Sequence, residues 1–270
     1  MSELCAGDVA LLGVAYDHKS SFLRGPALAP PCIRRVLHNG ASGLTAENGD
    51  PVVDHPRFRD LGDVEISDDE GAYLAIGEHI KPILAADARP FVLGGDHSIS
   101  YPIIRSVTES YGPLTILHFD AHTDLYDEYE GDRFSHACPF ARVMEHCADH
   151  RLIQIGIRSA SDHLREQAER FDVETVTAAA FSASAVPLDF DGPVYVSFDM
   201  DVLDPAFAPG VSHHEPGGLS TRDVLGLIRN LRGTVVGADL VEFNPVRDRE
   251  DITAMVAAKL VRELGHKLLY

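Results

Sequence analysis

The chain alternates short apolar runs with longer amphipathic stretches, and this alternation limits the folds open to it more than any other feature. The short runs are rich in Val, Ile and Leu and predict buried strands at 9–14, 90–93, 114–119, 152–157, 194–198 and 234–241. The longer stretches place apolar residues three or four positions apart and predict helices at 70–86, 98–111, 161–170, 221–231 and 252–264. We therefore expect an α/β fold of three layers, with a central, mainly parallel sheet between helices.

Length and organisation favour a single domain over residues 1–270. The sequence contains no repeat, low-complexity tract or composition shift that would mark a boundary, and the aperiodic stretch 39–56 is expected to be a surface loop. A chain of 270 residues buries enough surface to fold without the help of a metal. Any bound metal is therefore expected to serve catalysis.

The charge balance and the chain's start narrow its partners and location. The 23 Lys and Arg against 42 Asp and Glu give a net charge of −19, which disfavours nucleic acid and anionic membranes and favours a cationic ligand. Four cysteines without short paired spacing predict neither a disulfide framework nor a zinc knuckle. The start, Met1-Ser2-Glu3-Leu4, lacks the features of a signal peptide, and we expect a cytoplasmic protein that does not enter a membrane.

Three clusters of ionisable residues follow predicted strands. His97 comes after a turn that contains two glycines, and taken alone it is more typical of a turn histidine than of a ligand. Asp120, His122 and Asp124 alternate after the strand 114–119, and in an extended chain such residues point to one side. This spacing predicts a metal site better than it predicts a solvated turn.

Carboxylates two residues apart, Asp199 and Asp201, end another buried strand. Together with Asp120 and Asp124 they bring four negative charges to one edge of a parallel sheet, where two divalent cations would balance them. Carboxylates and imidazoles without thiolates suit Mn²⁺ better than a closed zinc site. Paired metals activate a shared water, so the sequence predicts a two-metal hydrolase.

These motifs resemble the ureohydrolase family of arginases and agmatinases. The likeness is carried by residues 94–98 (Gly-Gly-Asp-His-Ser), 120–124 (Asp-Ala-His-Thr-Asp) and 199–205 (Asp-Met-Asp-Val-Leu-Asp-Pro), in that order, and it extends over nearly the whole chain. The sequence is most similar to the agmatinase-like branch that includes plant-type arginases. The resemblance implies the arginase/deacetylase-like fold and cleavage of a guanidino compound to urea and an amine.

The resemblance also implies a ligand set for two Mn²⁺ ions per subunit. One ion would be held by His97, Asp120, Asp124 and Asp199, and the other by Asp120, His122, Asp199 and Asp201, with Asp120 and Asp199 bridging. Homo-oligomers, trimers or hexamers, are implied in the same way.

Further site residues follow from the resemblance. His136 matches the histidine that passes a proton to the leaving amine, and Glu242 matches the carboxylate that orients the guanidinium. Both are expected to touch the substrate, and Asp124 is expected to act in catalysis as well as in metal binding. His213 stands where many family members carry a threonine near the guanidino group, and it is also expected to bind the substrate.

The substrate is the least determined property. Asp127, Glu128, Glu130 and Asp132 lie between the second motif and His136, and an acidic pocket mouth built from them would favour a cationic tail. On this argument agmatine ranks slightly ahead of L-arginine, whose carboxylate would need a cation such as Arg24 or Arg158. We therefore expect an agmatinase, with arginase or another guanidino or guanidine ureohydrolase as the alternative.

Two readings from other classes remain open. An acetylpolyamine deacetylase on the related fold would use a single Zn²⁺ with fewer ligands, and the presence of both His97 and His122 disfavours it. A non-catalytic protein that keeps the fold for assembly is disfavoured by the presence of His136 and Glu242. Release of urea, set beside release of acetate from acetylputrescine, separates these readings.

Overall fold

The computed structural model describes residues 4–66 and 71–270. The first three residues of the N-terminal segment and the start of the helix predicted at 70–86 therefore lie outside the described residues. None of the helices described is long and apolar enough to cross a membrane.

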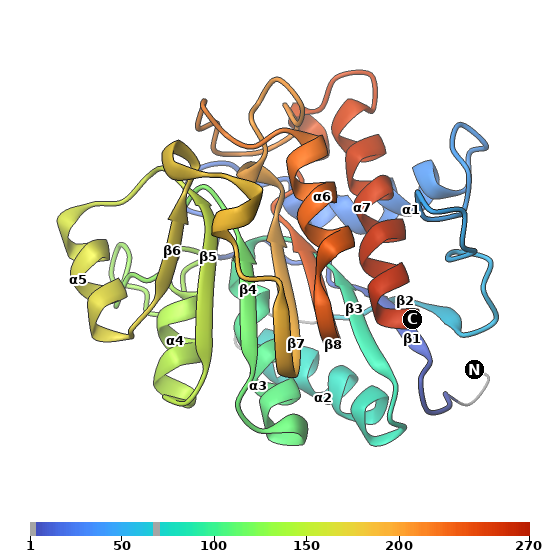
Figure 1. The fold of residues 1–270 in the computed structure, drawn as a ribbon, viewed down its shortest axis with the longest axis horizontal. Helices are drawn as coiled ribbons and strands as arrows, with labels where there is room; N and C mark the ends of the chain where they lie inside the picture. Colours follow the sequence, from blue (N-terminus) through green and yellow to red (C-terminus); the bar gives the residue numbers. More distant parts are fainter. Residues whose placement is uncertain (1–3, 67–70) are drawn as a thin grey trace.

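The strands form one sheet in which every pairing is parallel (Figure 1), which confirms the predicted α/β class. Its strand order is β2-β1-β3-β8-β7-β4-β5-β6. The strands are β1 (Val9–Gly13), β2 (Phe58–Asp63), β3 (Arg89–Leu93), β4 (Thr115–Phe119), β5 (Arg151–Ile157), β6 (Glu174–Thr177), β7 (Asp189–Asp199) and β8 (Arg232–Val241).

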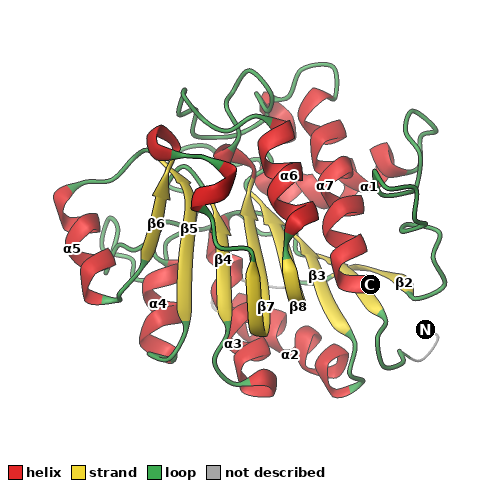
Figure 2. Cartoon of the chain, viewed as in Figure 1, coloured by secondary structure: helices red, strands yellow, loops and turns green. Residues whose placement is uncertain are grey.

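Helices cover both faces of this sheet and complete three layers (Figure 2). One face packs against α1 (Ala29–Leu37), α6 (Thr221–Asn230) and α7 (Ile252–Leu269). The other packs against α2 (Ala72–Ala85), α3 (Ser100–Tyr111) and α4 (Pro139–His146), with α5 (Asp162–Arg170) near the β6 edge. Short 3₁₀ turns fill several connections, among them η2 (His97–Ile99) and η5 (Met200–Val202).

The apolar strands supply both cores because their side chains alternate between the two faces. Val9 and Leu11 of β1 join the core under α1, α6 and α7, whereas Ala10 and Leu12 join the core under α2, α3 and α4. Burial on both faces explains why the central strands are continuous apolar runs.

All the predicted strands and helices are present, and two strands and two helices were not predicted. The missed strands β2 and β6 lie at the two edges of the sheet. Both are mainly polar, β2 is mostly half-buried and β6 mostly exposed, so they lack the apolar signal of the central strands. The missed helices α1 and α4 are short and have proline in their first turn. The stretch 39–56 is irregular, as predicted, apart from one bridge between Thr45 and Pro51.

The register of the central strands sets the position of the site. Leu93 of β3, Leu240 of β8, Phe198 of β7 and Phe119 of β4 form one row across four adjacent strands. Parallel strands end at the same edge, so the residues that follow this row emerge together. The three ionisable clusters and Glu242 all follow it within a few residues.

Candidate metal centre and active site

His97 reaches the sheet edge through a tight turn. A side chain at Gly95 would collide with the carbonyl oxygen of Tyr16, which instead accepts a hydrogen bond from the Asp96 amide at 2.9 Å. Asp96 caps the following 3₁₀ turn by accepting the Ser98 amide. The glycine thus permits the close backbone approach that fixes His97.

The imidazole of His97 is surrounded by three carboxylates. Its Nδ1 lies 3.1 Å from an oxygen of each of Asp120, Asp124 and Asp199, and its side chain is 1% exposed. The same nitrogen is buried and has well-formed hydrogen bonds to none of them. Asp124 joins the group from a left-handed backbone, with φ of 51°, and not from the extended alternation predicted for 120–124. We call this group the buried position.

A second group lies beside it and shares Asp120. His122 Nδ1 lies 3.0 Å from Asp201 and 3.4 Å from the other oxygen of Asp120. The His122 side chain is 27% exposed, so this group faces the pocket, and we call it the open position. The second oxygen of Asp199 accepts the Asp201 amide, which holds the two acids of the β7 end in fixed relation.

The negative charge of the buried carboxylates favours cation binding at both positions. Burial, with repulsion from Asp201 and Asp120, raises the pKa of Asp199 well above its ordinary value. Burial alone would lower the pKa of His97, but the close carboxylates of Asp120, Asp124 and Asp199 raise it well above its ordinary value. Without a metal the cluster thus retains protons. Donor atoms about 3 Å apart also match the edges of an octahedral shell with ligands at roughly 2.1 Å. The residues present therefore fit divalent ions.

A buried relay orients His97. The pKa of Tyr195 is raised well above its ordinary value by burial and by Asp239, so its phenol stays protonated and donates to Asp239 at 2.7 Å. Ser197 also donates to Asp239, at 2.7 Å, and its oxygen therefore accepts from Nε2 of His97 at 3.0 Å. With its proton on Nε2, His97 presents a lone pair at Nδ1 to the buried position.

His118 lies close enough to count as a third imidazole at the cluster, but its hydrogen bonds give it another role. The amide nitrogen of Gln154 donates to the carbonyl of Thr123 at 2.6 Å and to Nδ1 of His118 at 3.0 Å. The remaining His118 proton is then on Nε2 and is donated to Asp120 at 2.7 Å. His118 orients the shared carboxylate and has no lone pair left for a metal.

His136 and Glu242 form a buried pair next to both positions. Oε1 of Glu242 accepts from Nδ1 of His136 at 2.9 Å and from the His97 amide at 3.0 Å, which leaves Oε2 to face the pocket. Burial alone would lower the pKa of His136, but the hydrogen bond with Glu242 raises it to about 9. The Ser21 amide, 3.2 Å away, points at Nε2 and favours an unprotonated nitrogen there. The proton at Nε2 is therefore the labile one. Asp132, four residues before His136, is paired with Lys19.

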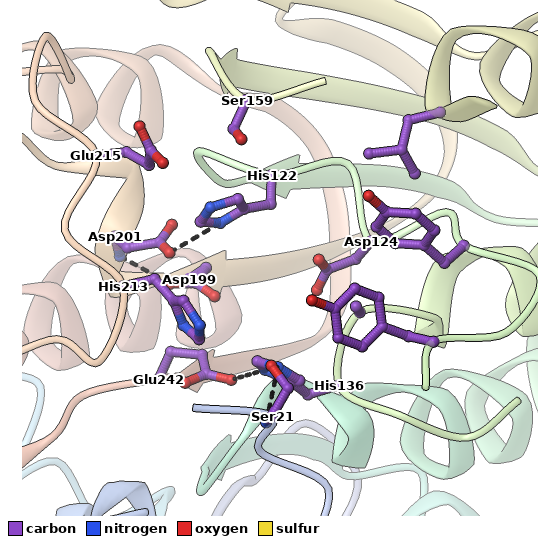
Figure 3. A pocket seen from close by; sticks show the side chains of 14 residues that line it. Ser21, His122, Asp124, His136, Ser159, Asp199, Asp201, His213, Glu215 and Glu242 are labelled. Carbon is purple, nitrogen blue, oxygen red and sulfur yellow. Dashed lines mark hydrogen bonds and ion pairs between the residues drawn. The ribbon is translucent and has the colours of Figure 1, made fainter. Parts of the chain in front are cut away.

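A pocket of about 270 Å³ opens onto these residues (Figure 3). Much of its lining is buried. We define its rim as five half-exposed residues of the lining: Tyr126, Tyr129, Ser159, His213 and Glu215. Of these only His213 was predicted as a site residue; its ring is 5.4 Å from that of His136, and burial lowers its pKa. Glu215 is two residues beyond His213 and follows no strand, so no motif in the sequence marks it as a site residue.

The structure corrects two expectations about the pocket mouth. None of the four acids between the second motif and His136 lines the pocket: Asp127 is paired with Arg133 and Arg142, and the adjoining wall is formed by Tyr126 and Tyr129. Arg158 is not available to a substrate carboxylate, because its guanidinium donates to backbone carbonyls, including those of Asp201 and Glu215.

Comparison with known proteins agrees with this geometry. The Arginase family matches residues 7–266. The chain is 50% identical to "Arginase 1, mitochondrial" of Arabidopsis thaliana, across 96% of this chain and 80% of that protein. It is 34% identical to an agmatinase of Bacillus cereus, across 95% of this chain and 90% of that protein.

Structural comparison leads to the same group. An arginase from Medicago truncatula superposes with a TM-score of 0.91 at 46% identity, covering 97% of this chain and 88% of that one. The profile match, the sequence relatives and the shared architecture agree over nearly the full length of the chain. The chain therefore belongs to the arginase family and is an amidinohydrolase of the ureohydrolase type.

Proposed function

We propose that the protein is a binuclear manganese arginase that hydrolyses L-arginine to L-ornithine and urea. The observation that carries the choice of substrate is the higher identity to relatives named arginase, 50% against 34% for the agmatinase. This reverses the ranking expected from the sequence. The acidic mouth on which that ranking rested is not present, since Asp127 and Asp132 bind cations of the protein itself.

The proposed metal content rests on the two positions that share Asp120. His97, Asp120, Asp124 and Asp199 would hold one ion, and His122, Asp201 and the shared acids would hold the other. An all nitrogen and oxygen donor set favours Mn²⁺. Such a pair of ions supplies an activated water at neutral pH.

The protein's own residues prepare the substrate for attack. Oε2 of Glu242 faces the pocket and accepts N–H groups of the planar guanidinium, while Oε1 stays bonded to the His97 amide. Glu242 thereby places the guanidinium carbon next to the buried carboxylates of the pocket lining. Because the Glu242 backbone has φ of 62°, the side chain turns away from the line of β8 toward the pocket.

His136 supplies the proton that the leaving amine needs. The hydrogen bond with Glu242 raises the pKa of His136 to about 9 in the metal-free protein, so the ring readily takes up a second proton at Nε2. The proton on Nδ1 is retained by Glu242, and the one on Nε2 is transferred to the amine as the C–N bond breaks. Ser21, whose hydroxyl lies 2.8 Å from Nε2, holds the ring in place for this transfer.

Agmatine hydrolysis is the second candidate, because no Lys or Arg is among the described residues that line the pocket. The test is a urea assay of the manganese-loaded protein with L-arginine, agmatine and guanidinobutyrate. We expect kcat/KM for arginine to exceed that for agmatine at least tenfold, which corresponds to about 1.4 kcal/mol of transition-state preference. A value for agmatine equal to or above that for arginine would refute the arginase proposal.

A further inference from the structure

The rim of the pocket contains one acid whose role the reaction does not explain. We propose that Glu215 binds the ammonium group at the tail of the substrate, so that the guanidino compound is held by a carboxylate at each end. This inference rests on the proposed function and deepens it. The ammonium is common to arginine and agmatine, so Glu215 would set the preference for amine-bearing tails.

The distribution of charge around the pocket is the first argument. Asp124, Asp199, Asp201 and Glu242 line the pocket and are buried, whereas Glu215 lines it and is half-exposed. The four buried acids serve the metal positions and the guanidinium. Glu215 is thus the acid at the rim of the described pocket, and no Lys or Arg among the described lining residues competes for it.

The free carboxylate of Glu215 is the second argument. In the part of the chain that the structure describes, this carboxylate forms neither a hydrogen bond nor an ion pair. Asp127 and Asp132, which lie outside the pocket lining, are instead neutralised by arginine and lysine side chains. An unpaired carboxylate facing a pocket gains a charge-assisted bond when an ammonium enters.

The backbone of Glu215 is fixed relative to the metal ligands, which is the third argument. Arg158 donates through Nε to the carbonyl of Glu215 at 2.8 Å and through Nη2 to the carbonyl of Asp201 at 2.6 Å. A side chain at Gly218 would collide with the same guanidinium. One rigid, planar group therefore sets the distance between the rim acid and the open position.

The arrangement matches a substrate with charge at both ends. In the view of Figure 3, Asp201 and His213 lie between Glu215 and Glu242. A guanidinium on Glu242 then extends its alkyl chain past His213. The ammonium at the far end of that chain reaches the side of the pocket where Glu215 lies.

The test compares three substrates on the manganese-loaded wild-type protein and on Glu215→Gln. L-arginine and agmatine carry the ammonium, and 1-butylguanidine has the same guanidinium with an uncharged tail. We expect kcat/KM to fall about tenfold for arginine and for agmatine, and less than twofold for butylguanidine. Glu215→Asp, which keeps the charge on a shorter arm, is expected to fall between the wild type and Glu215→Gln.

Controls separate recognition from structural damage. Glu128→Gln removes an exposed acid outside the pocket and should leave all three substrates unchanged. Manganese content of Glu215→Gln should equal that of the wild type. An equal fall for all three substrates, or unchanged values for arginine and agmatine, would overturn the assignment.

Failure of the proposed function gives a different result. A wild-type protein that prefers agmatine refutes the arginase proposal. The role of Glu215 is then still tested by comparing the effect of Glu215→Gln on agmatine with its effect on butylguanidine. If the wild-type protein turns over neither substrate, calorimetric binding of L-ornithine and putrescine tests the role of Glu215. The affinity for both should weaken about tenfold in Glu215→Gln. Binding that is undetectable in the wild type, or unaltered in the variant, counts against the inference.

Discussion

The buried and open positions share Asp120 but are built in different ways. His97 of the buried position is 1% exposed and is oriented from behind by Ser197, Asp239 and Tyr195. His122 of the open position is 27% exposed and lies on the pocket wall. The difference teaches that the sheet interior determines one ion site, while the loops that receive substrate determine the other.

Removing the carboxylate of Asp120, which the two metal positions share, should disrupt both of them. Asp120 presents one oxygen to His97 and the other to His122, so we expect Asp120→Asn to lose both metal equivalents and its urea release to fall to background. Elemental analysis after manganese loading and dialysis measures this. The exposed Asp191→Asn is the control and should keep two equivalents. If Asp120→Asn kept one full equivalent of manganese and remained active, Asp120 would not serve both metal positions.

Removing one histidine at a time should separate the positions. We expect His122→Asn to keep about one manganese per chain, because the three carboxylates around His97 remain. His97→Asn should lose the buried ion and weaken the open one, since Asp120 and Asp199 would lose their common partner. If His97→Asn kept one manganese and His122→Asn lost both, the open position would be the one that binds its ion independently.

The His136–Glu242 pair predicts a pH-dependent stability of the metal-free protein. The pKa of His136 is raised to about 9, so the folded state binds the proton more tightly than the unfolded state does. The resulting stabilisation is complete below about pH 6.5 and is lost as the pH rises through about 9. Its size is on the order of 3 kcal/mol at most.

Chemical denaturation between pH 6 and 10 measures this stabilisation as the difference between wild type and His136→Asn. The difference in unfolding free energy should decrease with increasing pH. A difference that increases with pH would show that the ring is neutral in the folded protein. Adding Mn²⁺ places positive charge near the ring and should move the transition to lower pH.

The smallest effect is expected from breaking the hydrogen-bonded chain of Tyr195, Asp239 and Ser197 that orients His97. Ser197→Ala removes the acceptor of the His97 Nε2 proton, and we expect the manganese affinity of the buried position to fall roughly 10–100-fold with the open position unchanged. Competition with a chelator resolves the two affinities. Ser106→Ala, a buried hydroxyl on α3 that bonds only its own helix, is the matched control. Equal weakening of both positions would show that the relay supports the cluster as a whole.

Much of the architecture follows from the sequence because the central strands are buried on both faces. That burial makes β1, β3, β4, β5, β7 and β8 continuous apolar segments, and the parallel class follows from their alternation with helices. The strand order cannot be predicted in this way, because the periodicity of a segment does not determine which strands pair with it. The adjacency of β3, β8, β7 and β4, which brings His97 to the acids, is visible only in the fold.

The same limit applies to the site. Residues that directly follow apolar strands, such as Asp120 and Asp199, are found by their position and brought together as predicted. Glu215 comes from a loop, and its location depends on the Arg158 contacts that join distant segments. Ser197 and Asp239 did leave a signal, since they are polar residues inside apolar strands, where an unpaired polar group is costly.

The edge strands β2 and β6 affect how copies of the chain can associate. An open sheet presents unpaired backbone groups along its outer strands, which invite a neighbouring molecule to add a strand. Here β2 carries Asp60 and Asp63, which engage Arg34 of α1, and β6 carries Glu174, which engages Arg151 of the adjoining strand. Extending the sheet would disrupt these ion pairs, so we expect self-association to use helical or loop surfaces and to leave the borders of the sheet solvated.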